Sequence, residues 1–237
     1  MHYEIVPMKE NTWRIEDNGV RFFLLTGTEK ALLIDSGRDV HNARDIAESL
    51  TSLPLMLLNT HADRDHTGSN AQFDAFFMHP AEEENYRRSG GQGQILPVGE
   101  GDEIDLGGRV LRLIHLPGHI PGSLAVLDVR NRVLISGDPV QEHGRIFMFG
   151  AHRNMEDYVR SLSKLETLTG EFDEIWPSHG DIPIRPDVIP RLRRGAQEVL
   201  AGRAAGTPGE VFGNRLAVFD LGFSVLLCDP ELLAEKN

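Results

Sequence analysis

The sequence predicts an α/β fold that forms one domain over residues 1–237. Strand-like and helix-like segments alternate along the chain, and no shift in composition marks a linker between them. The length of 237 residues suits a single domain of moderate size. Segments 32–37 and 133–138 are weakly similar, because both are apolar and end in a turn of small and acidic residues. This similarity indicates a sheet architecture in two halves.

The first half of the chain is predicted to contain strands separated by two helices. Asp39 can cap a helix, because apolar residues follow it at near-helical spacing. Pro80 can begin a second helix, which carries acids in its first turn. The expected strands of this half are 21–26, 31–35, 53–58 and 75–78, with a turn at 27–30.

The second half follows a polar, glycine-rich segment at 90–108, which we expect to be a surface loop. Asn154 can cap an amphipathic helix that begins at Met155, and a further helix is expected over about 187–205. The expected strands of this half are 110–115, 124–128, 132–136 and 174–176, followed by a closing hairpin of 216–219 and 224–227.

Composition narrows the classes of partner and compartment. The net charge of -12 argues against a nucleic-acid backbone, and the basic cluster at Arg191, Arg193 and Arg194 is interpreted as the polar face of a helix. No apolar run approaches the ~20 residues of a membrane span, and the N-terminus shows no signal peptide pattern. Cys228 is the only cysteine, which excludes an internal disulfide. We therefore expect a cytoplasmic protein that acts on a small molecule.

Four apolar strands are each followed directly by residues that can bind a metal ion. The densest group lies within 59–68, where two histidines and two aspartates occupy six positions. Imidazole suits zinc, iron and manganese, and a shared carboxylate can bridge two ions. Taken singly, the later candidates are equally well explained as ordinary loop residues. The candidates are His61, Asp63, Asp65 and His66, then His119, then Asp138, then His179.

These motifs resemble those of the metallo-β-lactamase superfamily. The resemblance extends from the early hairpin that ends in Asp35-Ser36-Gly37 to the segment around His179. It implies an αββα sandwich, in which two mixed β-sheets are flanked by helices and a metal site lies at one edge. The most similar segments are 59–68, 98–104, 113–123 and 134–138, in that order.

The resemblance also implies a ligand set for two divalent metal ions. His61, Asp63 and His119 would hold the first ion. Asp65, His66 and His179 would hold the second, and Asp138 would bridge the two. We expect zinc, with manganese or iron as the alternatives.

Asp63 is the one ligand position at which the chain departs from the family pattern. The usual motif is His-x-His-x-Asp-His, and Asp63 stands where the second histidine is expected. An aspartate is a shorter, harder ligand that adds negative charge, which shifts the preference of the site toward manganese or iron. Diiron flavoproteins of the same superfamily carry a glutamate here. The alternative is that the first site is weak and only the second site fills.

The implied activity is hydrolysis of a small ester, thioester or lactone, as in the glyoxalase II-like and lactonase branches. Divalent cations bring the pKa of a bound water from 15.7 toward about 7, and the resulting hydroxide would attack the substrate. Asp65 and Asp138 are the expected catalytic residues, because Asp65 can orient that water and Asp138 holds the bridge. A diiron-type oxidoreductase acting on oxygen or a thiol is the alternative, and a non-catalytic metal-binding module is a third hypothesis.

Two features near Asp138 have more than one interpretation. His143 and His152 could donate a proton to the leaving group, or they could be ordinary surface or packing residues. The apolar segment 145–150 could form a pocket wall above the metals, or it could join the core.

Overall fold

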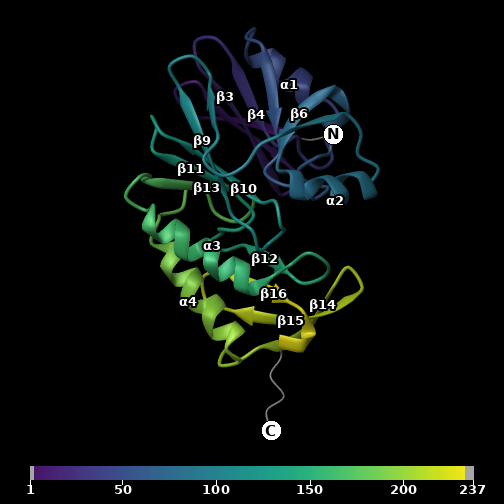
Figure 1. Cartoon of the computed structure of the whole chain (residues 1–237), viewed down its shortest axis with the longest axis vertical. Coiled ribbons are helices and arrows are strands. Elements are labelled where there is room, and N and C mark those ends of the chain that lie inside the picture. Colours follow the sequence, from purple (N-terminus) through teal and green to yellow (C-terminus); the bar gives the residue numbers. More distant parts are fainter. Residues whose placement is uncertain (1–2, 233–237) are drawn as a thin grey trace.

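The computed structural model describes residues 3–232, which form three β-sheets and four α-helices (Figure 1). Two of the sheets pack face to face, and helices cover the outer face of each. Within residues 3–232, no helix combines the length and the apolar character that a membrane crossing requires.

The first sheet has seven strands that lie side by side in sequence order. Its strands β1 to β4 are antiparallel, and the pairs from β4 to β7 are parallel. The bounds are β1 (Tyr3–Lys9), β2 (Thr12–Asp17), β3 (Val20–Thr26), β4 (Ala31–Ile34), β5 (Leu55–Leu58), β6 (Ala75–Met78) and β7 (Gln94–Pro97).

The second sheet has five strands in the order β13-β11-β10-β9-β8. Only β11 and β13 pair in parallel, so this sheet is also mixed. The bounds are β8 (Glu103–Asp105), β9 (Val110–His115), β10 (Leu124–Asp128), β11 (Val133–Gly137) and β13 (Glu174–Pro177).

Alternating side chains join these two sheets into a sandwich. Phe23 and Leu25 of β3 pack in one core cluster with Leu113 and Val126 of the second sheet. The neighbouring side chains of β3 point the other way, so that Phe22 packs in a separate cluster with α1 (Ala43–Leu50) and with Tyr86 of α2 (Glu83–Arg88). Successive side chains of a strand point to opposite faces of the sheet, so β3, which lies between two core clusters, is apolar on both faces.

The outer face of the second sheet is covered by α3 (Met155–Thr167) and α4 (Val188–Leu200), whose apolar stripes share one core cluster with it. Asn154 caps α3 as predicted, because its Oδ1 accepts a hydrogen bond from the Asp157 amide at 3.0 Å. The layer order of helices, sheet, sheet and helices therefore confirms the expected αββα sandwich of two mixed β-sheets.

A third sheet was not expected as a separate unit. The predicted closing hairpin is present as β15 (Asn214–Asp220) and β16 (Val225–Cys228), but it pairs with β12 (Arg145–Met148) and β14 (Thr207–Val211) in the order β12-β16-β15-β14. Figure 1 shows this sheet beside α3 and α4 in the lower half of the view. Its buried face packs into the same core cluster as those helices.

Two expectations about local structure were wrong. The segment 90–108 is not only a loop, because β7 pairs with β6 and β8 pairs with β9. Both are short edge strands, which need little apolar character on their open side. Asp39 does not cap α1, which begins at Ala43 after Asn42. The cause is the Asp17 carboxylate, which accepts hydrogen bonds from the amides of 38–40 and holds that segment outside the helix.

Candidate metal centre

The strands β5, β9, β11 and β13 each end at the same edge of the sandwich, and the segment after each strand brings candidate ligands there. Two groups of side chains have potential ligand atoms that all lie within 4.8 Å of one another. The first group is His61, His119 and Asp138, and the second is Asp65, His66 and His179. These two groups contain six of the seven residues that the sequence singles out, and Asp63 is the seventh.

Asp138 lies between the two groups and faces both of them. Its Oδ2 is 3.6 Å from His119 Nε2 and 4.0 Å from His61 Nε2. Its Oδ1 is 3.2 Å from His66 Nε2 and 3.5 Å from His179 Nε2. This position suits the bridging role that the family resemblance implies.

Unpartnered polar atoms at the centre test whether these residues fit metal ions. Among residues 3–232, the buried Nε2 atoms of His61, His66 and His119 and the buried Oδ1 of Asp138 have no hydrogen-bond partner. Buried polar atoms are otherwise almost always satisfied, so a shared set pointing at one space indicates a ligand that supplies the missing contacts. The residues fit one or two divalent cations.

The opposite nitrogen of each histidine ring is held by the protein. Each Nδ1 has a polar neighbour, and these are Thr60 Oγ1 at 3.0 Å for His61, Asp35 Oδ2 at 2.7 Å for His66, Phe147 O at 2.7 Å for His119 and Gly19 O at 2.7 Å for His179. Such outer contacts fix the ring orientation and leave Nε2 available to a metal ion.

The acidic ligands remain charged without a cation in place. Burial alone would raise the pKa of Asp138, but the neighbouring His179 and His66 hold that pKa well below its usual range. Burial also opposes ionisation of Asp65, yet His66 and His179 lower its pKa to about 2. Burial and the proximity of His66 lower the pKa of His61 to about 4. Burial opposes protonation of His66 and His179, but Asp138 and other neighbouring carboxylates raise the pKa of both imidazoles. A cation bound to the second group would therefore displace protons from these two histidines.

Asp63 reaches the first group but also has another partner. Its Oδ2 lies 3.4 Å from His119 Nε2 and 3.7 Å from His61 Nε2, while Arg153 Nη2 lies 2.6 Å from the same oxygen. Burial would raise the pKa of Asp63, but the hydrogen bond from His119 and the charges of His61 and Arg153 hold it below its usual range. The guanidinium balances the charge that this aspartate adds. Coordination of metal by Asp63 stays a prediction.

Asp35 is a functional candidate that the motif analysis did not assign to the site. It follows β4 directly, and its Oδ1 accepts the Thr60 amide at 2.7 Å. Its Oδ2 accepts the Thr60 hydroxyl at 2.8 Å and lies 2.7 Å from His66 Nδ1. A buried carboxylate behind a ligating histidine orients the ring and raises its basicity. The sequence did contain a sign of this role, because Asp35 is an acid at the end of the predicted strand 31–35, just as His61 follows the predicted strand 53–58.

Glu82 is a second unassigned residue, and it connects the two ligand loops. It lies in a 3₁₀ turn (Pro80–Glu82), is fully buried, and accepts the Ala62 amide at 3.0 Å and the Gly122 amide at 2.7 Å. Ala62 follows His61, and Gly122 lies three residues after His119. Burial raises the pKa of Glu82, although both amides favour its charged form. A Cβ at Gly122 would lie only 2.6 Å from Glu82 Cγ, so the contact requires glycine there.

We expect Glu82→Ala to loosen both ligand loops. The change leaves two buried amides without an acceptor, which should lower the free energy of unfolding of metal-free protein by about 2–4 kcal/mol. Metal affinity should fall about 10- to 100-fold, the usual effect of removing an outer partner of ligands. Denaturant unfolding in chelator and a metal titration measure the two effects.

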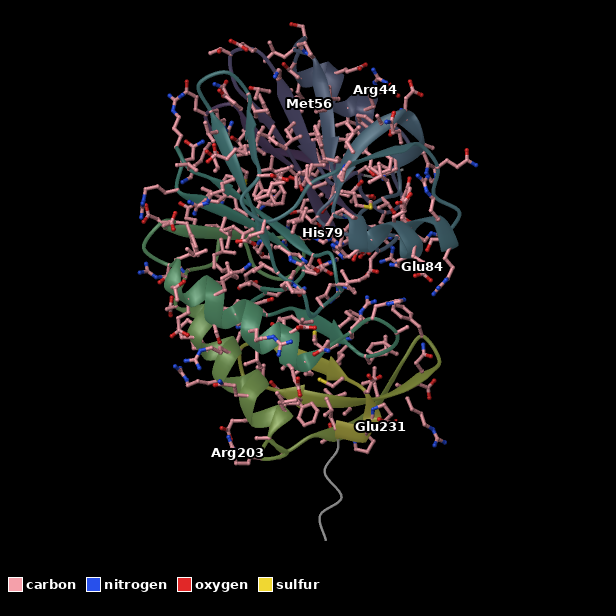
Figure 2. The ribbon with its side chains drawn as sticks, in the orientation of Figure 1. Arg44, Met56, His79, Glu84, Arg203 and Glu231 are labelled. Atoms are coloured by element: carbon pink, nitrogen blue, oxygen red, sulfur yellow. The ribbon has the colours of Figure 1, made fainter. Side chains whose placement is uncertain are left out.

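The matched control is Glu84→Ala, two residues away. Among residues 3–232, Glu84 forms an ion pair with Arg88 alone, and both side chains are more than half exposed. Figure 2 shows Glu84 at the outer surface. This variant should stay within about 0.5 kcal/mol of the native protein. Equal stability and equal metal affinity in the two variants would show that Glu82 does not brace the loops.

The ligand groups open onto a cleft of about 760 Å³. Its lining includes Asp65, Asp138, His119 and His179 and also Arg38, Arg64, Arg145, Arg153, Phe147 and Phe212. The apolar segment 145–150 contributes both to the core and to the wall of the cleft. Ile146 and Met148 are buried in the core, while Phe147 lines the cleft.

Neither of the two suggested proton donors is among the cleft-lining residues. His143 is exposed and pairs with Asp181, with 2.7 Å between Nδ1 and Oδ2. His152 lines a separate hollow with Pro117 and Gly118. The chemistry of the cleft therefore depends on the metal ligands and the arginines.

Comparison with known proteins agrees with this geometry. Residues 16–179 match the metallo-beta-lactamase superfamily. The chain belongs to this superfamily. It is accordingly a hydrolase of the metallo-β-lactamase type, with the candidate metal centre at the edge where the fold places it.

Several relatives of this superfamily member carry hydrolase names. Acyl-coenzyme A thioesterase MBLAC2 of Gallus gallus is 28% identical over 202 residues, which cover 68% of this chain and 73% of the relative. Hydroxyacylglutathione hydrolase of Rhodospirillum rubrum is 34% identical over 172 residues, or 68% of this chain and 65% of the relative. The solved metallo-beta-lactamase from Pontibacter korlensis superposes with a TM-score of 0.70 at 15% identity, covering 83% of this chain and 99% of that chain. This last likeness concerns the fold alone.

Proposed function

We propose that this chain is a metal-dependent hydrolase of small thioesters. The observation that carries the proposal is the pair of His/Asp groups on either side of Asp138, which open onto a cleft large enough for a small molecule. The names of the relatives support the thioester class, because they include acyl-coenzyme A thioesterases and hydroxyacylglutathione hydrolases.

The chain's own residues divide the work at the centre. His61, His119 and Asp138 would hold one ion, and Asp65, His66 and His179 would hold the other. Divalent ions there would lower the pKa of a water toward about 7 and polarise the substrate carbonyl. Asp65 lines the cleft and is held in its charged form, so it can accept a hydrogen bond from the attacking water and fix its direction.

The choice of thioester over ester follows from the leaving group. The histidines among the described cleft-lining residues are His119 and His179, and both belong to the ligand groups. A thiol has a pKa of about 8.5, so it can leave as a thiolate without receiving a proton first. An alcohol is a far weaker acid and needs a general acid, whose contribution is about 10²- to 10⁴-fold.

A matched substrate pair tests the proposal. We expect protein loaded with zinc or manganese to hydrolyse a thioester at least about 10²-fold faster, in kcat/KM, than the oxygen ester of the same acyl group and a matched lactone. Chelation should abolish turnover, and added metal should restore it. Comparable rates on ester or lactone would contradict the thioester assignment. Activity that survives chelation would contradict metal dependence.

A further inference from the structure

Three arginines on the rim of the cleft are not engaged in ion pairs. Arg38 follows β4, Arg64 lies within the ligand loop, and Arg145 begins β12. All three are exposed, and none has an acidic partner within residues 3–232. Most other arginines of the chain are paired, including Arg153 of the same cleft, which holds Asp63. Three uncommitted guanidinium groups around one opening are unusual in a chain of net charge -12.

An exposed aromatic platform lies at the same rim. Phe212, at the turn between β14 and β15, is 81% exposed, the highest value among the exposed large hydrophobic residues of the described chain. Its ring stacks on that of Phe147, with centroids 6.4 Å apart and planes 12° apart. Both rings line the cleft. In Figure 1 the β14–β15 hairpin extends from the third sheet toward the segment after β12.

The charges in the cleft leave these arginines available for substrate. Asp63, Asp65 and Asp138 face the metal positions, so two divalent ions would offset their charge. Asp39 is the other acid of the lining, and its Oδ2 is bound by Asn18 Nδ2 at 2.5 Å. Guanidinium groups bind phosphate through paired hydrogen bonds, and exposed rings stack on nucleobases.

We infer that Arg38, Arg64 and Arg145, together with the Phe147–Phe212 stack, form a subsite for the phosphate-bearing, nucleotide-like end of the thiol carrier. The thioester would then extend inward to the ligand groups. This inference rests on the proposed function and names the class of carrier. A carrier that bears only carboxylates would use the arginines but would leave the aromatic platform without a partner.

Direct binding tests the subsite without turnover. The probe is adenosine 3′,5′-bisphosphate, which has the phosphates and the nucleobase but no thioester, and the method is calorimetry on metal-loaded protein. We expect the Kd to rise about three- to fivefold for each of Arg38→Gln, Arg64→Gln and Arg145→Gln. Phe212→Ser should raise it at least about fivefold. Raising the salt concentration to about 0.5 M should weaken binding markedly.

The control is Arg194→Gln, which removes one exposed positive charge on α4 outside the cleft-lining set. It should leave the Kd unchanged. Inorganic phosphate and S-methylglutathione serve as comparison ligands, and both should bind more weakly than the nucleotide. The inference is overturned if the nucleotide does not bind, if the rim variants bind it like the native protein, or if S-methylglutathione binds as tightly.

A kinetic comparison separates this inference from the proposed function. The same acyl group is presented on coenzyme A and on pantetheine, which lacks the nucleotide. The ratio of kcat/KM should favour coenzyme A, and Arg145→Gln should lower that ratio. Hydrolysis of both thioesters without arginine-dependent nucleotide binding would overturn the subsite and leave the function standing. Arginine-dependent binding without thioester hydrolysis would overturn the function and leave the subsite standing.

Discussion

His66→Ala is expected to remove metal from the second ligand group and to lower kcat/KM by more than about 10²-fold. His66 Nε2 is buried, unpartnered among the described residues and 3.2 Å from Asp138 Oδ1, so its loss removes a ligand and leaves the shared carboxylate less constrained. Loss of outer partners alone costs 10–100-fold in such sites, and loss of a ligand should cost more. Metal analysis of purified protein and thioester kinetics measure the two effects.

The control for this variant is His41→Ala, which removes an exposed histidine just before α1. Its metal content and activity should equal those of the native protein. Far-UV circular dichroism of both variants shows whether the fold is retained. Full metal content and turnover in His66→Ala would remove this residue from the ligand set and, with it, the two-ion assignment.

Asp63→His is the second prediction, and we expect it to raise the ratio of bound zinc to bound manganese roughly tenfold. The change replaces a hard carboxylate by an imidazole and restores the usual family pattern. It also releases Arg153, whose Nη2 lies 2.6 Å from Asp63 Oδ2. Competition dialysis against equal zinc and manganese, followed by elemental analysis, measures the preference.

Arg153→Gln separates two roles for Asp63. If Asp63 coordinates metal, the Gln variant should keep the native zinc-to-manganese ratio more closely than Asp63→His does. If Asp63 serves only as the partner of Arg153, both variants should lose similar stability and neither should shift the ratio. Protein purified without added metal tests the oxidoreductase alternative, which predicts bound iron and iron-dependent oxygen consumption.

The regular elements with strong apolar patterns could be predicted from sequence, and the weakly apolar ones could not. β3, β4, β9 and β10 are buried on one or both faces, so their side chains carry the pattern that identifies a strand. β7 and β8 are short and partly exposed, and they are strands only because β6 and β9 supply hydrogen bonds. The single domain and the cytoplasmic location stay predictions.

The candidate ligands were visible in the sequence because each group of them follows a buried strand. An apolar strand that ends in histidine or aspartate is a local pattern. It indicated seven candidates, which are His61, Asp63, Asp65, His66, His119, Asp138 and His179. The local sequence therefore indicated the candidate metal-binding residues, and the resemblance of these motifs to the metallo-β-lactamase superfamily indicated the fold.

The surroundings of the ligands were decided only by the tertiary structure. Asp35 lies 31 residues from His66, Glu82 lies 40 residues from Gly122, and Arg153 lies 90 residues from Asp63. Arg38, Arg64 and Arg145 likewise come from three separate segments of the chain. Hydrogen bonds and charge pairs act through space, so no local pattern encodes them. Packing brings these segments to one edge of the sandwich. Only there do they form the contacts that orient the candidate ligands, balance the charge of Asp63 and would recognise the substrate.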